Sequence, residues 1–289
     1  MLNEQGPVLI AANHPNSFLD AIILATLFKN PVYSLARGDA FHKKIIAKIL
    51  ASFNMLPVYR VSEGVENLEH NYSTFDACRD LFKQQKIVLI FSEGRCINEW
   101  HLRPLKKGTA RLALAAWEQN IPLKVLPLGI NYSNFKKFGK TLKLNFGNII
   151  SKEKIFSDLS SGKAITEFNQ ILFEQFKNLV FELDNTEKET LKNYFNLHPS
   201  FLKKVILFLP SVAGFLFHFP LYYAIHFCIK KKASDHYDSI MTGSLFFLYP
   251  FYVLIVTLII FLITHSLVSL WLLIAMPFSA FCLLHFKNN

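Results

Sequence analysis

The chain has 289 residues, a formal net charge of +10 and a pI near 9.3. Hydrophobic residues make up 52% of it, and the mean hydropathy of +0.27 is high for a protein that is soluble throughout. The basic balance predicts an anionic partner, which is a nucleic acid, an anionic lipid surface or a phosphorylated substrate. Apolar segments of membrane length favour the lipid options. No nucleic-acid recognition motif appears, so we expect no nucleic-acid partner.

Short apolar runs alternate with longer amphipathic stretches over the first half of the chain. The apolar runs predict strands at 8–12, 32–36, 55–59, 86–91, 125–132 and 142–146. The stretches between them predict helices at 18–28, 41–53, 66–84 and 108–119. This alternation is typical of an α/β fold with a largely parallel sheet flanked by helices. Ligands bind such sheets where the strands end.

The predicted helix at 41–53 is basic and amphipathic. Ile45, Ile46 and Ile49 recur at helical spacing, and Lys44 and Lys48 are interleaved with them. Two interpretations remain open. The apolar face rests on an anionic membrane surface, or it packs into the core while the basic face meets solvent. The second interpretation is at least as favoured as the first.

The composition becomes strongly apolar after residue 200, which predicts a first domain at 1–200 and a membrane-associated region at 201–289. The segment 205–229 contains prolines and predicts a re-entrant or interfacial element. The segments 243–264 and 266–286 are long enough to span a bilayer and predict a transmembrane hairpin. Lysines flank these segments, so the positive-inside rule predicts a multi-pass membrane protein whose first domain faces the cytoplasm.

The four cysteines, Cys78, Cys96, Cys228 and Cys282, are scattered along the chain. No cysteine pair or His/Cys cluster has the spacing of a zinc site, so we expect no metal. The pattern is typical of a reduced, cytoplasm-facing protein. The first residues lack a basic segment followed by a long apolar run, so we expect no signal peptide.

Polar residues follow the ends of three predicted strands. His14 follows 8–12, Arg60 follows 55–59 and Glu93 follows 86–91. Because parallel strands end at a common edge, we expect the three side chains to share one edge of the sheet.

His14 and Asp20 form the first candidate for chemistry. A carboxylate on one imidazole nitrogen fixes the tautomer and leaves the other nitrogen as a base. Ser17-x-x-Asp20 is also a capping-box pattern, in which Ser17 caps a helix and Asp20 reaches back to the N–H of the cap. From these residues alone the cap is the more economical interpretation, although Asp20 is able to serve both roles.

Four stretches, taken in order, resemble the motifs of the phospholipid-synthesis acyltransferases, the PlsC-like glycerol-3-phosphate and lysophosphatidate acyltransferases. They are NHPNSFLD at 13–20, LPVYR at 56–60, FSEGR at 91–95 and VLPLGI at 125–130. The resemblance covers residues 7–132. Most of that family has four residues between the motif histidine and aspartate, whereas this chain has five, as one branch of the family does.

The resemblance implies transfer of an acyl group from acyl-CoA or acyl-ACP to a hydroxyl of glycerol-3-phosphate or lysophosphatidate, with no other cofactor. It implies that His14 is the general base and that Asp20 orients it, which raises the catalytic interpretation well above the cap alone. An acyl-enzyme on Ser17 is a minor alternative. The implied substrate-binding residues, with Arg60 on phosphate and Pro127 beside the acyl group, are Arg60, Glu93, Gly94, Arg95, Arg103, Lys106 and Pro127.

The sequence departs from the family pattern at the third motif. Ser92 replaces the usual proline, and Arg95 directly follows Gly94, so the cation that meets phosphate is open among Arg60, Arg95, Arg103 and Lys106. Other functions also stay open: an acyltransferase for another lyso-lipid, a thioesterase, or a non-catalytic lipid-binding membrane protein. The thioesterase is disfavoured because no G-x-S-x-G elbow is present.

Overall fold

The computed structural model describes residues 6–59, 70–136, 138–183, 188–196, 201–230 and 236–287. The chain divides into two compact units. The first comprises Met1–Asn131 and Lys143–Glu182, and the second comprises Tyr132–Leu142 and Leu183–Asn289.

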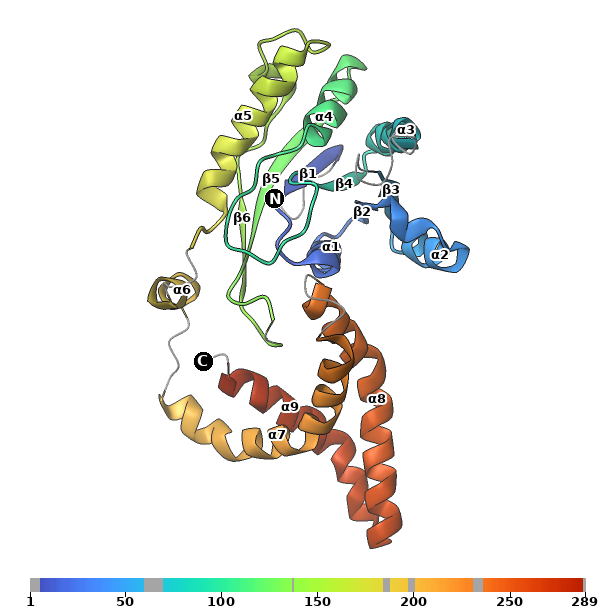
Figure 1. The fold of residues 1–289 in the computed structure, drawn as a ribbon, viewed down its shortest axis with the longest axis vertical. Helices are drawn as coiled ribbons and strands as arrows, with labels where there is room; N and C mark the ends of the chain where they lie inside the picture. The colour runs from blue at the N-terminus through green and yellow to red at the C-terminus, as the bar shows by residue number, and fades with distance from the viewer. Residues whose placement is uncertain are drawn as a thin grey trace. The chain divides into compact units, whose positions relative to one another are not determined.

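A six-stranded sheet forms the centre of the first unit (Figure 1). Its strands, in the spatial order β3-β2-β4-β1-β5-β6, are β3 Met55–Val58, β2 Val32–Arg37, β4 Ile87–Phe91, β1 Val8–Ala12, β5 Lys124–Tyr132 and β6 Leu142–Phe146. The pairs β1–β4, β1–β5, β2–β3 and β2–β4 are all parallel. After β5 the chain turns back, and an antiparallel bridge joins Val125 to Ile150. The predicted α/β fold with a largely parallel sheet is confirmed.

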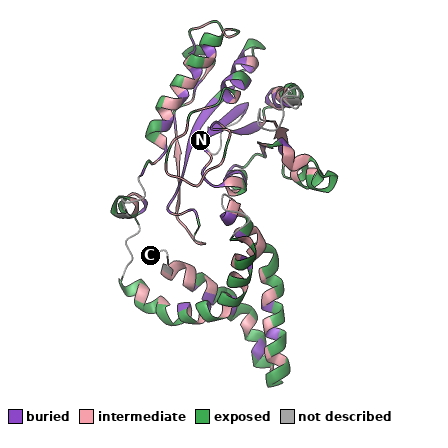
Figure 2. Ribbon diagram, in the orientation of Figure 1, coloured by how far each residue is buried: buried purple, intermediate pink, exposed green. Residues whose placement is uncertain are grey.

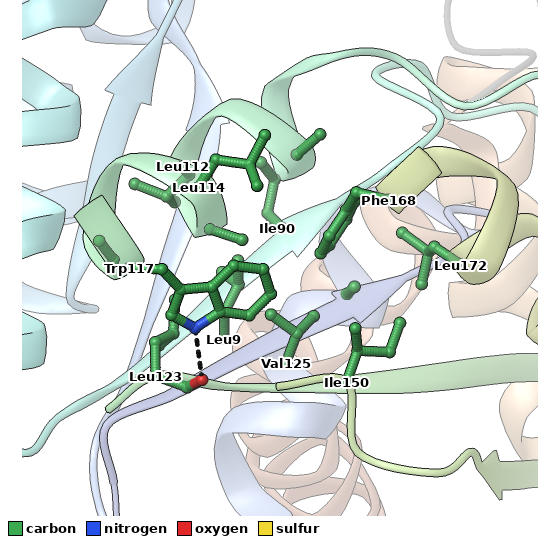
Figure 3. Close-up of a cluster of buried hydrophobic side chains, with 14 of the residues drawn as sticks. Leu9, Ile90, Leu112, Leu114, Trp117, Leu123, Val125, Ile150, Phe168 and Leu172 are labelled. Atoms are coloured by element: carbon green, nitrogen blue, oxygen red, sulfur yellow. Dashed lines mark hydrogen bonds between the residues drawn. The ribbon is translucent and has the colours of Figure 1, made fainter. Parts of the chain in front are cut away.

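Helices cover this sheet because its strands are apolar on both faces. Every residue of β1 is buried, as expected for a central parallel strand. The helices of the unit are α1 Ser17–Leu27, α2 Lys44–Ser52, α3 His70–Lys83, α4 Gly108–Glu118 and α5 Gly162–Leu179. Side chains of α3, α4 and α5 join one buried cluster with alternate residues of β1 and β4. Trp117 fills the middle of this cluster and donates its indole N–H to the Leu123 carbonyl at 2.8 Å (Figure 3).

The helix α2 stands apart from this core. It begins later than the sequence pattern predicts, because Gly38–Phe41 forms a separate 3-10 turn. None of its residues is buried, and Ile45 and Ile49 are 75% and 50% exposed. The interpretation that its apolar face packs into the core is therefore wrong.

Long apolar helices dominate the second unit. Besides α6 Lys188–Phe195 and a 3-10 turn at Leu267–Trp271, it contains α7 Phe201–Ile229, α8 Tyr237–Thr264 and α9 Leu272–Lys287. Three segments, Phe201–Ile229, Tyr237–Thr264 and Leu267–Phe286, are long and apolar enough to cross a membrane. These helices support the prediction of a membrane protein.

The helix α7 covers the segment for which the sequence predicts a re-entrant or interfacial element. It is a single helix of 29 residues with Pro210 and Pro220 inside it, and Figure 1 shows that it bends. A Cβ atom on Gly214 would lie 2.3 Å from the Ser279 carbonyl oxygen, so α7 and α9 approach closely at this glycine. The number of crossings and the side of the membrane stay predictions.

Candidate active site

The parallel pairing of β1 and β4 brings two predicted site residues together. Ala12 pairs with Phe91, so His14 and Glu93 each lie two residues beyond paired positions at the same edge of the sheet. The Ser92 N–H donates to the Ala12 carbonyl at 2.8 Å and extends the pairing beyond the strands. The His14 N–H then donates to Glu93 Oε2 at 2.8 Å. Arg60, the third residue expected at this edge, lies outside the described residues.

His14 and Asp20 form a directly bonded pair. The distance between His14 Nδ1 and Asp20 Oδ2 is 2.9 Å. The Asp20 side chain is completely buried, whereas the His14 side chain keeps 15% of its surface exposed. A carboxylate is an acceptor, so it favours the tautomer with the proton on Nδ1 and leaves Nε2 with a lone pair for proton exchange. The pair has the composition and geometry of an oriented general base.

The turn between His14 and Asp20 absorbs the five-residue spacing. The helix α1 begins at Ser17, whose φ of 50° lies in the left-handed region, and its cap residue is Asn16. The prediction that Ser17 is the cap is therefore wrong by one residue. Asp20 Oδ2 accepts the Asn16 N–H at 2.8 Å, so this carboxylate binds both the cap backbone and His14. The Ser17 N–H donates to Cys96 Sγ, with 2.8 Å between nitrogen and sulfur.

An aromatic ring fixes the plane of the imidazole. Phe91, the last residue of β4, stacks on His14 with 3.8 Å between ring centroids and 11° between ring planes. The bond from Asp20 to Nδ1 and the stacking of Phe91 on one face together restrain the orientation of the imidazole ring. Phe91 is the first residue of the FSEGR stretch, but the sequence pattern alone predicts no role for it. The only sequence feature that could have indicated this contact is the position of Phe91, two residues before Glu93 at the end of a predicted strand.

Glu93 holds the loop that follows β4. Its two carboxylate oxygens accept backbone N–H groups, Oε2 from His14 and Oε1 from Arg103, the latter at 2.9 Å. The side chain is buried, and this burial raises the pKa of the Glu93 carboxyl, although the two N–H donors oppose the rise. Glu93 therefore connects the end of β1 to the loop at 92–107 that carries the candidate cations.

The loop places its basic residues around Gly94. The φ of Gly94 is 67°, and a Cβ atom there would lie 3.0 Å from Lys106 Cγ, so this position suits glycine. The Lys106 N–H donates to the Ser92 carbonyl at 2.8 Å. Arg95 and Lys106 are exposed, whereas Arg103 is half-buried and its Nε lies 2.7 Å from Glu99 Oε1. Lys106 thus lies beside Gly94, which Arg95 directly follows, and both cationic residues are exposed.

Pro127 lies inside the sheet rather than at its edge. It is buried in β5, where it pairs with Ala11. The contact between the end of β1 and β5 at this edge comes from Asn13, for which the sequence pattern predicts no role. Asn13 Nδ2 donates to the Ile130 carbonyl at 3.0 Å, and Asn13 Oδ1 accepts the Ile130 N–H at 2.7 Å. A side-chain amide therefore continues the β1–β5 pairing and fixes the backbone next to His14.

The described part of the chain has no group of three or more His, Cys, Asp or Glu side chains arranged to hold a metal ion. Its distinctive chemistry is a histidine held by a buried carboxylate at the carboxyl edge of an α/β sheet. Such a centre suits an enzyme that removes a proton from a hydroxyl or a water.

Comparison with known proteins indicates which class of enzyme this centre belongs to. Residues 1–131 match the family model described as Acyltransferase, which supports the acyltransferase family for that part of the chain. No curated protein matches the chain. The matched residues contain β1, the His14–Asp20 pair, Glu93 and the loop at 92–107. With the long apolar helices, the match indicates a membrane acyltransferase.

Proposed function

We propose that this protein transfers a fatty acyl group from an acyl thioester, acyl-CoA or acyl-ACP, to a hydroxyl of glycerol-3-phosphate or lysophosphatidate in phospholipid biosynthesis. The observation that carries the proposal is the 2.9 Å contact between His14 Nδ1 and the buried Asp20 carboxylate, which supports Nε2 as the proposed base. The acyltransferase match over residues 1–131 supports the reaction type, and the long apolar helices support a lipid substrate.

The proposed reaction begins with proton removal. His14 Nε2 takes the proton of the acceptor hydroxyl as its oxygen attacks the thioester carbonyl carbon. The tetrahedral intermediate collapses when the carbon–sulfur bond breaks, and the imidazolium returns the proton to the leaving thiolate. The products are an ester and a free thiol, so no further cofactor is needed. Positioned general base catalysis contributes roughly 10²- to 10⁴-fold to the rate.

Asp20 has two roles in this proposal. It keeps the proton on Nδ1, and it stabilises the imidazolium that forms during the attack. Because Asp20 also binds the Asn16 N–H, its position is tied to the start of α1 and to the end of β1. The base is thus restrained before the substrate binds, which lowers the entropic cost of reaching the reactive geometry.

The phosphate of the acceptor is the proposed partner of the basic loop. Arg95, which follows Gly94, and Lys106, which packs beside it, are both exposed. A guanidinium suits a phosphate because it donates two hydrogen bonds and stays charged. Arg103 is a weaker candidate because Glu99 engages its Nε. Arg60 is proposed for the same role from its motif alone. The first unit is proposed to face the cytoplasm, where acyl-CoA and acyl-ACP are available.

The test is thiol release by the detergent-solubilised full chain, with acyl-CoA and acyl-ACP offered against glycerol-3-phosphate, lysophosphatidate and other lysophospholipids. Products are identified by lipid mass spectrometry. We expect acceptor-dependent thiol release that His14→Ala abolishes, whereas His42→Ala, at an exposed histidine of the same unit, keeps it. Full activity in His14→Ala would overturn the mechanism.

The acceptor panel also separates the alternatives. Thiol release without any acceptor would identify a thioesterase. Acylation of a lysophospholipid other than lysophosphatidate would identify a different acceptor. Arg95→Ala and Lys106→Ala are expected to raise the KM of a phosphate-bearing acceptor and to leave the KM of the acyl donor unchanged. An unchanged acceptor KM in both variants, and in Arg60→Ala, would remove the phosphate from the proposal.

A further inference from the structure

The surface of α2 combines exposed apolar side chains with a row of lysines. Ile45, Ile49 and Phe53 follow one another at one-turn intervals and are 75%, 50% and 55% exposed. Ile46, which is 42% exposed, lies beside them. These four residues are called the α2 apolar face. In Figure 2 the helix at this position is coloured as exposed or intermediate along its length.

The lysines occupy one side of the α2 apolar face. Lys44 and Lys48 lie one turn apart and are both exposed, and Lys43, directly before the helix, is exposed as well. At 100° per residue, Lys44 and Lys48 project on one side of the apolar face, whereas the half-buried Ala47 and Leu50 project on its other side. The helix itself contains no acidic residue.

From this arrangement we propose that α2 is an interfacial helix, which docks the first unit onto an anionic lipid bilayer. The apolar face is expected to enter the boundary between headgroups and acyl chains, while the lysines contact anionic headgroups. Charge complementarity argues for this occupant: an apolar protein partner would match the isoleucines and leave the lysine row unpaired. The same chain carries three segments long and apolar enough to cross a membrane, so a bilayer is available to it.

Exposure of the α2 apolar face to water is unfavourable unless a partner covers it. Large aliphatic side chains gain roughly 1.5–3 kcal/mol each on burial, so three of them on one exposed face are expected to have a partner. A bilayer surface supplies apolar contact and negative charge at once. The proposal concerns an interaction surface and stands independently of the acceptor proposed above, because its test needs no activity.

The test places an environment-sensitive fluorophore on α2 in the full chain, reconstituted into vesicles. The probe is attached at Ile45→Cys in a background with Cys96→Ser and Cys228→Ser, because Cys78 and Cys282 are buried. The matched control is Tyr72→Cys on α3, because Tyr72 is 76% exposed and Ile45 is 75% exposed. The vesicles contain phosphatidylcholine alone or phosphatidylcholine mixed with phosphatidylglycerol, with and without brominated acyl chains.

We expect a blue shift and quenching by brominated lipid at position 45 in the phosphatidylglycerol vesicles, and neither change at position 72. Removing lysines by Lys44→Gln and Lys48→Gln is expected to reduce the docked-to-undocked ratio roughly five-fold for each lysine. The matched pair Lys83→Gln and Lys177→Gln, which removes the same charge from exposed positions on α3 and α5, should leave that ratio unchanged.

Three results would overturn the proposal. Identical spectra at positions 45 and 72 would mean that α2 stays in water. A blue shift without quenching by brominated lipid would mean that protein, such as a second copy of the chain, covers the face. Equal quenching in both vesicle types, unaffected by the lysine substitutions, would remove the anionic surface as the partner.

Discussion

Glu93 Oε2 accepts the backbone N–H of His14 at 2.8 Å, across 79 positions of sequence. This bond joins the end of β1, where the proposed base His14 lies, to the loop that carries Gly94, Arg95 and Lys106. The proposed base and the proposed phosphate-binding loop therefore share one buried carboxylate. A change at Glu93 is expected to affect both.

Replacing Glu93 with glutamine keeps the shape but removes one acceptor. The amide NH₂ then faces a backbone N–H, either that of His14 or that of Arg103, which leaves a donor without its partner. Such a loss costs ~1–3 kcal/mol of unfolding free energy. Thermal unfolding of the purified variant in detergent measures the loss, and an unfolding midpoint equal to that of the native chain would contradict it.

The same variant tests the pH dependence of folding. Burial raises the pKa of Glu93 in the folded state, so the folded state binds its proton more tightly than the unfolded state does. The stability advantage of the native chain over Glu93→Gln is therefore largest below the ordinary carboxyl pKa. It shrinks as the pH rises through the raised folded value. Measuring the unfolding free energy of both proteins across a pH series checks the direction of this change. A stability advantage of the native chain that grows with pH would contradict the prediction.

Asp20→Asn tests the orienting role of the carboxylate. The neutral amide does not stabilise the imidazolium, and it favours a different tautomer of His14. We expect kcat to fall by roughly 10²- to 10⁴-fold with little change in the KM of either substrate. Asp39→Asn serves as the control because Asp39 is a partly exposed carboxylate paired with Arg37, and its kcat should match the native value. A drop of similar size in both variants would show a general effect on folding instead.

Ser17→Gly separates a direct transfer from an acyl-enzyme. The φ of Ser17 is 50°, a region that costs an L-residue roughly 1–2 kcal/mol and costs glycine little. The glycine variant is therefore expected to fold well and to keep its kcat, because the proposed mechanism does not use the hydroxyl. Mass spectrometry of the protein after a single turnover provides the second readout. Loss of kcat, together with an acyl adduct in the native chain that the variant lacks, would favour the acyl-enzyme.

Phe91→Leu tests the stacking contact on the imidazole. An aromatic pair of this kind contributes ~0.5–1.5 kcal/mol beyond its buried area. We expect kcat to fall about 2- to 10-fold in the leucine variant because His14 gains freedom to rotate. Phe91→Tyr keeps the ring and should keep most of the activity. Steady-state kinetics with saturating acceptor measure kcat for the native chain and both variants. A kcat of Phe91→Leu equal to that of the native chain would mean that Asp20 alone is sufficient to hold the ring.

The buried strands were predictable because their patterns are local. Val8 to Ala12 and Ile87 to Phe91 are continuous apolar runs bounded by polar residues, and a run of that length predicts a buried parallel strand. The parallel arrangement followed from the alternation of strands and helices. The edge that His14 and Glu93 share followed in turn, because parallel strands end at the same side.

Other features depended on contacts between distant residues. The amphipathic pattern of α2 was visible, but whether its apolar face meets the core or the surroundings depends on where the helix is packed. The stacking of Phe91 on His14 and the bonds of Asn13 to Ile130 depend on the register between β1 and its neighbours. Register is a property of paired strands, and no single segment of sequence contains it.

The sequence by itself determined the α/β fold, the long apolar helices and the residues from which the candidate site is built. It left open whether Asp20 caps a helix or orients His14. The tertiary structure decided that Asp20 does both, because one buried oxygen reaches the Asn16 N–H and His14 Nδ1 together. The turn that joins the two residues contains Ser17, whose φ of 50° lies in the left-handed region, and the sequence does not reveal this backbone conformation.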